Sequence, residues 1–288
     1  MIELIFEPFS YQYMRDAILV SMLVGGVCAF MSAYLVLKGW SLMGDALAHS
    51  IVPGVALAYL LALPYAIGAF FAGLLAAGSM AFIRTQTKLR EDVIIGMVFT
   101  TFFAIGLLMV SINPTSVNIQ GIILGNILAI SHSDIIQVVI ISLICLICLL
   151  VTWKNLVSVF FDEIHARSIG LPVTALNIMF FTLLSGVTVA ALQTVGACLV
   201  IAMVVTPGAT AYLLTDRFGR MICLSVLLGV VTSGVGAYIS YYLNTPPGGL
   251  IVTLQTIIFL IAFIAAPKYG YLTTHLKIRQ AGKIREGA

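Results

Sequence analysis

Hydrophobic residues follow one another along most of the chain in long blocks, and short polar or glycine- and proline-containing segments separate these blocks. Each block has roughly 20 residues, the length of helix that crosses ~30 Å of hydrocarbon. The blocks lack the alternation of apolar and polar residues that a membrane strand needs, so the pattern predicts helices. We expect nine such stretches, near residues 16–37, 42–63, 65–83, 93–112, 134–153, 173–192, 195–214, 221–243 and 250–266.

The composition indicates that lipid is the main solvent of this chain. Hydrophobic residues make up 61% of the 288 positions, whereas Asp, Glu, Lys and Arg supply 9%. A soluble domain of ordinary composition carries about 25% charged residues. The sequence therefore predicts an all-α, polytopic transmembrane helical bundle of about eight or nine spans, with residues 1–288 as a single transmembrane domain.

Basic residues indicate which loops face the cytoplasm, because Lys and Arg near span ends are retained on that side. Four basic segments follow the third, fifth, seventh and ninth stretches, so an even number of spans separates them and the assignments agree. They are the loop with Arg84, Lys88 and Arg90, the loop of residues 154–172 with Lys154 and Arg167, the turn with Arg217 and Arg220, and the tail of residues 268–288. We expect a cytoplasmic C-terminus. The small net charge of +3 reflects this topology and does not indicate nucleic-acid binding.

One acidic residue and one histidine are predicted to lie within a span. Asp45 is about one turn inside the second stretch, and His49 follows four residues later, on the same helical face. Ionisable groups within the membrane are costly and usually face a cavity, a partner or an ion path. Pro53 and Gly54 come next, and a proline there predicts a helix break that lines such a pathway. An Asp–His hydrogen bond that only fixes helix packing is the alternative.

An imidazole nitrogen and a carboxylate oxygen suit a hard or borderline divalent cation such as manganese, iron(II) or zinc. Two ligands do not complete a site, so the sequence predicts help from a second copy of the chain, from backbone carbonyls or from water. A homodimer with a central pathway would bring two copies of Asp45 and His49 together.

The loop of residues 154–172 carries a second candidate function. Motifs for metalloprotease, serine hydrolase and ATP-binding chemistry are absent from the sequence, so the chain is expected to be no enzyme, and any ATP hydrolysis must come from another subunit. An aspartate at a helix N-cap and a glycine after the helix end predict a short helix with an apolar edge, which would bind that subunit. The coupling residues are Phe161, Asp162, Glu163, Ile164, Arg167 and Gly170, with Ile169 on the apolar edge. A solvated loop without a partner is the alternative.

Two further segments carry expectations about structure. Small residues at a spacing of four, in the rows Gly25-Ala29-Ala33 and Ala69-Gly73-Ala77, predict closely packed helix pairs. The outer segment of residues 113–133 is too short to span, and both a short helix at the membrane surface and an ordered loop stay open for it.

The sequence resembles the ABC-3 family, the membrane permeases of ATP-binding-cassette importers for manganese, iron and zinc. The resemblance covers nearly the whole chain, and its motifs include the Asp45–His49 segment and the coupling loop. Within the family the chain looks most like the manganese/iron permeases of Gram-negative bacteria, the Sit and Yfe type. The matching segments are residues 44–56, 161–171, 194–196, 206–211 and 247–249, with residues 37–45 and 110–118 for the Sit and Yfe type.

This resemblance implies a type II ABC importer-like permease in the bacterial inner membrane, working as a homodimer or with a related second permease. It implies cytoplasmic ATPase subunits and a periplasmic metal-binding protein as partners. The transported ion would be manganese and/or iron(II), as substrate and not as a cofactor, and no cofactor is expected. A zinc importer of the same family and a secondary ion-coupled carrier, in which Asp45 would titrate, are the alternative functions.

Overall fold

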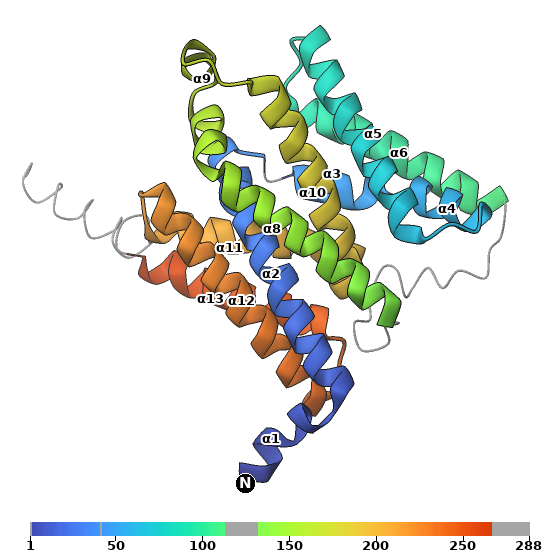
Figure 1. The fold of residues 1–288 in the computed structure, drawn as a ribbon, viewed down its shortest axis with the longest axis vertical. Helices are drawn as coiled ribbons and strands as arrows, with labels where there is room; N and C mark the ends of the chain where they lie inside the picture. The colour runs from blue at the N-terminus through green and yellow to red at the C-terminus, as the bar shows by residue number, and fades with distance from the viewer. Residues whose placement is uncertain (1, 41, 113–131, 267–288) are drawn as a thin grey trace, which may run out of the picture.

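The computed structural model describes residues 2–40, 42–112 and 132–266, and the predictions for residues 113–131 and for the tail lie outside these ranges. The described part is helical throughout, and the long apolar stretches of the sequence form its long helices (Figure 1). The helices are α1 (Ile2–Ser10), α2 (Gln12–Lys38), α3 (Met43–Ser50), α4 (Val52–Leu60), α5 (Tyr65–Gln86), α6 (Glu91–Ile112), α8 (His132–Phe161), α9 (Glu163–Ser168), α10 (Val173–Val195), α11 (Ala197–Leu214), α12 (Phe218–Leu243) and α13 (Pro247–Ala265).

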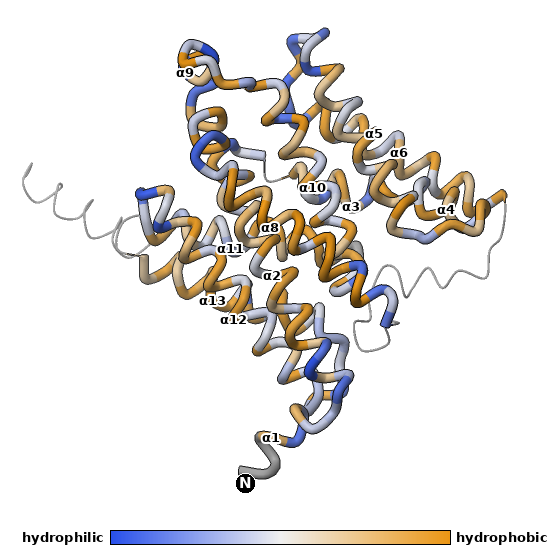
Figure 2. The backbone as a smooth tube through the Cα atoms, viewed as in Figure 1, coloured by the Kyte–Doolittle hydropathy of each residue, from blue (hydrophilic) through white to orange (hydrophobic). Residues whose placement is uncertain are grey.

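Within the described residues, eight helical segments are long and apolar enough to cross a membrane, and α3 with α4 counts as one of them. The seventh predicted stretch, residues 195–214, forms α11, whose apolar part is shorter. The predicted all-α membrane bundle is therefore confirmed. Figure 2 shows hydrophobic residues along the helices and hydrophilic residues gathered near their ends.

The centre of the bundle is α2, which is buried along most of its length and packs against α8, α10, α11 and α12. Its contact with α12 depends on small residues. A Cβ atom added to Gly229 would lie 2.4 Å from the Gly25 carbonyl oxygen and 2.5 Å from the Ala29 Cβ atom. Only glycine lets the two backbones approach this closely, so the predicted packing role of this row of small residues is confirmed.

The small residues of α5 have a similar role. Gly73 lies against α10, where an added Cβ atom would be 3.2 Å from the Ser185 hydroxyl oxygen, and its neighbours Ala69 and Ala77 are buried. Together with α4 and α6, α5 forms the part of the bundle on the right of Figure 1, and α11, α12 and α13 lie on the other side of α2.

The loops that carry basic residues meet at one end of the molecule. Trp40, in the turn after α2, has Lys38 and Arg84 near its ring and also contacts Phe160, at the end of α8. Tyr34, near the same end of α2, contacts Phe218 at the start of α12. The charge pattern therefore predicted correctly that these connections lie at one end, and α1 lies at the opposite end (Figure 1).

Candidate functional site

Asp45 and His49 lie one helical turn apart on α3, as the sequence predicted. The distance from the His49 Nε2 atom to the Asp45 Oδ1 atom is 3.4 Å. The imidazole ring also lies against α6, with its centroid 5.4 Å from the Phe99 ring and 5.5 Å from the Phe103 ring. The aromatic rings restrict where the imidazole can turn, so α6 helps to fix the position of the histidine.

The pair occupies the least covered side of α3. The side chains of Asp45 and His49 are 34% and 24% exposed, whereas Ala48 is fully buried and Gly44 lies against Val204 of α11. Among the described residues, no group of three or more Asp, Glu, His or Cys side chains could hold a metal ion. One copy of the chain therefore presents two ligand atoms on an open face, and their use as metal ligands stays a prediction.

Directly after His49 along the chain, the second span is broken, as the sequence predicted. Helix α3 ends at Ser50, α4 starts at Val52, and Ile51 joins them. Proline has no backbone N–H, so Pro53 cannot make the α-helical hydrogen bond to the carbonyl of His49. The break therefore alters the backbone within one turn of the histidine.

Gly54 has a packing role in α4. An added Cβ atom would lie 2.1 Å from the carbonyl oxygen of Gly68 and 2.5 Å from the Cβ atom of Ala72, both on α5. Pro53 packs against Gly106 of α6. These contacts fix the broken segment between its neighbours, and the lining of a pathway by Pro53 and Gly54 stays a prediction.

We expect Gly54→Val to destabilise the protein, because the new side chain collides with the backbone of α5. Overpacking costs about 1–3 kcal/mol, which corresponds to a melting temperature lower by about 2–10 °C in detergent. Gly78→Val is the matched control, since nothing lies within 4 Å of a Cβ atom at Gly78. Equal melting temperatures for the two variants would contradict this packing role.

The loop after α8 forms the predicted short helix, α9. The Oδ1 atom of Asp162 accepts hydrogen bonds from the backbone N–H groups of Ile164, at 2.9 Å, and His165, at 3.0 Å. The bond from His165, with that from Ile164, holds the pKa of the Asp162 carboxyl below its ordinary value. The cap is therefore ionised at neutral pH, and Asp162 is confirmed as the N-cap.

Gly170 ends the loop helix in the way that the sequence predicted. Its φ angle is +81°, a left-handed conformation that glycine adopts without strain. Its N–H donates to the Arg167 carbonyl at 3.1 Å, and the Leu171 N–H donates to the Ala166 carbonyl at 3.0 Å. This pair of bonds is a Schellman motif, which turns the chain from α9 toward α10.

The apolar edge of the coupling loop points away from the protein. Phe161 is 75% exposed, Ile164 82% and Ile169 56%. On the other side of α9, Ala166 is buried, and the Glu163 Oε1 atom accepts a hydrogen bond of 3.0 Å from the Asn177 amide of α10. The loop is anchored on its inner side and exposes large hydrophobic side chains on its outer side, as a docking helix requires.

We expect Gly170→Val to misdirect the chain after α9, because a β-branched residue resists a positive φ angle. The loss of coupled transport should be about fivefold or more, as a loop conformation strained by 1–3 kcal/mol implies. Gly170→Asn is the control, because asparagine tolerates the left-handed conformation. The measurement is transport rate at equal permease content, and equal loss in both variants would contradict the argument.

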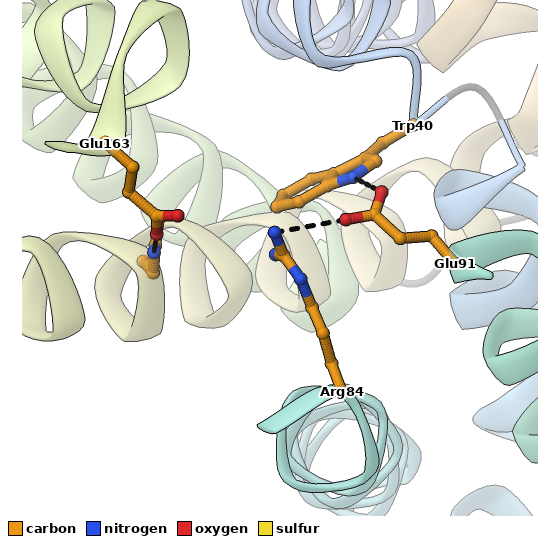
Figure 3. Close-up of polar contacts among 5 residues, drawn as sticks. Trp40, Arg84, Glu91 and Glu163 are labelled. Carbon is orange, nitrogen blue, oxygen red and sulfur yellow. Dashed lines mark hydrogen bonds and ion pairs between the residues drawn. The ribbon is translucent and has the colours of Figure 1, made fainter. Parts of the chain in front are cut away.

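A polar cluster under α9 was not predicted from the sequence (Figure 3). Glu91, at the start of α6, accepts a hydrogen bond from the Trp40 indole and forms an ion pair of 3.1 Å with Arg84. The cluster and the inner side of α9 line a cavity of about 280 Å³. The sequence signal was a tryptophan in a polar turn between two spans, but nothing in the sequence indicated its partners.

The long apolar helices packed around the buried α2 define a polytopic helical membrane protein. Comparison with known families agrees with this class. The chain belongs to the ABC 3 transport family, whose model matches residues 10–266. The family predicted from the sequence motifs is therefore confirmed.

Individual relatives resemble the chain over nearly its full length. It is 63% identical to the chelated iron transport system membrane protein YfeC of Yersinia pestis, over 97% of this chain and 95% of that protein. It is 48% identical to the manganese transport system membrane protein MntB of a Synechocystis strain, over 95% of this chain and 89% of that protein. The solved structure of PsaBC from Streptococcus pneumoniae in complex with Fab superposes with a TM-score of 0.85, at 34% identity, covering 96% of this chain and 100% of that chain.

Proposed function

We propose that this chain is the permease subunit of an ATP-binding-cassette importer for divalent transition metal ions, foremost manganese and iron(II). The observation that carries the proposal is the Asp45–His49 pair, a carboxylate and an imidazole 3.4 Å apart on the open side of a broken membrane helix. Relatives named for chelated iron transport and for manganese transport align with nearly the whole chain, which supports the same class of substrate.

A dimer explains how an incomplete pair serves as a transport site. Manganese and iron(II) take more ligands than one Asp and one His supply. If two copies face each other across the pathway, two carboxylates and two imidazoles surround the ion, and water or backbone carbonyls fill the other positions. A site of this kind binds an ion without a complete protein cage, which suits an ion that must also leave.

The two ends of the molecule are assigned to different partners. The basic loops favour a cytoplasmic position for the end with α9, and there the exposed edge of Phe161, Ile164 and Ile169 would bind an ATPase subunit. The end with α1 faces the periplasm, where a metal-binding protein delivers the ion. The C-terminal tail of residues 268–288 is cytoplasmic by the same reasoning.

Membership of an ABC transport family favours ATP over an ion gradient as the energy source. Zinc import remains the alternative because zinc accepts the same oxygen and nitrogen ligands.

Uptake of radioactive manganese by cells that produce the complete transporter tests the proposed substrate. We expect excess iron(II) to compete strongly and excess zinc weakly. Stronger competition by zinc than by iron(II) would make the chain a zinc permease instead. Uptake that stops when a protonophore collapses the ion gradient, at an unchanged ATP level, would favour a secondary carrier.

A further inference from the structure

Trp40 lies at the meeting point of four helices below α9. Its side chain is 4% exposed and is held on several sides (Figure 3). The Phe181 ring of α10 stacks on the indole with centroids 5.4 Å apart, and the Phe160 ring of α8 meets it edge-on at 5.5 Å. The Glu91 carboxylate accepts the indole N–H, and the Arg84 guanidinium lies 5.4 Å from the ring centroid.

Both segments that flank α9 therefore contact this indole. Phe160 is in the last turn of α8, two residues before Asp162, the N-cap of α9. Phe181 lies one turn beyond Asn177 on α10, and Asn177 donates the hydrogen bond that anchors Glu163 of α9. A displacement of α9 would move the end of α8, the start of α10 or both. Each of these helices has a phenylalanine ring in contact with the Trp40 indole.

The contacts of Trp40 continue to both helices that surround His49. The Trp40 carbonyl accepts a hydrogen bond of 3.0 Å from the N–H of Met43, the first residue of α3. Through Glu91, the indole is also tied to the first turn of α6, whose Phe99 and Phe103 contact His49. The path from α9 thus ends on the helix that carries the Asp–His pair and on the helix that packs against it.

We propose that Trp40 is the positioning residue that transmits the movement of α9 to the Asp45–His49 pair, so that ATP hydrolysis is coupled to metal release. The inference rests on the proposed function. The Phe160 and Phe181 rings pack directly against the indole, and side chains in direct packing contact transmit a displacement from one to the next. The ion pair of Arg84 with Glu91, at 3.1 Å, holds the acceptor of the indole N–H in place.

The first test measures ATP hydrolysed per metal ion transported by the assembled transporter in proteoliposomes. Trp40→Ala should raise this ratio by roughly twofold to thirtyfold, the range of coupling effects for residues between two sites. Trp40→Phe keeps an aromatic ring against Phe160 and Phe181 and should raise it less. Trp153→Ala is the matched control, since the other tryptophan lies near the same end without these contacts. An unchanged ratio in Trp40→Ala, or equal changes in Trp40→Ala and Trp153→Ala, would overturn the proposal.

The second test measures a permease that retains Trp40, so it can overturn or support the proposal even if Trp40→Ala fails to fold. In Trp153→Phe, Trp40 is the remaining tryptophan of the permease, and a complex with Trp40→Phe added supplies the background emission. We expect ATP to change the Trp40 emission of the complete complex. We further expect Asn177→Ala to reduce this change, whereas Thr174→Ala, on the same helix and lining the same cavity, leaves it intact. A Trp40 emission that does not change when ATP is added would overturn the proposal.

The two tests also separate this inference from the proposed function. Normal ATP-driven metal uptake together with a Trp40 emission that does not respond to ATP contradicts only the transmission through Trp40. An ATP-dependent change at Trp40 without metal uptake contradicts only the substrate assignment and leaves the transmission in place.

Discussion

Asp45→Asn and His49→Ala should each lower ATP-driven metal uptake by about a hundredfold or more, at near-normal expression and dimerisation. Mutating even an outer-shell partner of a metal ligand costs about 10–100-fold, and these two side chains would contact the ion itself. Both side chains are partly exposed and lie outside the buried face of α3, so their removal leaves that face in place, and His49→Ala additionally removes the ring contacts with Phe99 and Phe103. The measurement is the initial rate of manganese uptake per copy of permease.

Two comparisons make this result specific. The double variant should be no worse than either single variant, because ligands of one site act as a unit. Asp16→Asn removes a carboxylate near the opposite end, in α2, and should leave uptake near wild type. Wild-type uptake in either Asp45→Asn or His49→Ala would remove the pair from the transport pathway.

Ile164→Glu should release the ATPase from the permease or uncouple its hydrolysis from transport. Ile164 is the most exposed side chain of the apolar edge, at 82%. A central hydrophobic anchor typically contributes 2 kcal/mol or more, so the affinity should fall by about thirtyfold or more. Co-purification and the affinity between the two subunits measure the effect.

Leu89→Glu is the matched control for this substitution. Leu89 is also exposed, at 51%, and lies in the connection between α5 and α6 at the same end of the bundle. The control should bind the ATPase as the wild type does. If Ile164→Glu co-purifies with an undiminished amount of ATPase and transports normally, the exposed edge of α9 is a solvated surface and not a docking site.

The sequence was most informative where a single local interaction determines the structure. Runs of apolar residues predicted the spans because membrane helices satisfy their own backbone hydrogen bonds. Asp162 and Gly170 predicted the ends of α9 because an N-cap acceptor and a left-handed glycine act within a few residues. The i, i+4 spacing of Asp45 and His49 predicted their shared face for the same local reason.

Contacts between distant segments could not be predicted from one sequence. Arg84 was interpreted as a topology signal, and nothing near it indicated an ion pair with Glu91 and a contact with Trp40. The close approach of Gly54 to Gly68 depends on the angle at which α4 crosses α5, which the break at Ile51 sets. The prediction that the coupling loop begins at residue 154 was wrong, because α8 continues through residues 154–161, where Lys154 and Asn155 interrupt the hydropathy pattern.

Manganese uptake into proteoliposomes that contain the purified permease and its ATPase tests the central claim most directly. We predict uptake that requires ATP on the side of the ATPase, is absent with a proton or sodium gradient alone, and is lost in His49→Ala. Gradient-driven uptake without the ATPase, or ATP-driven uptake at the wild-type rate in His49→Ala, would contradict the account.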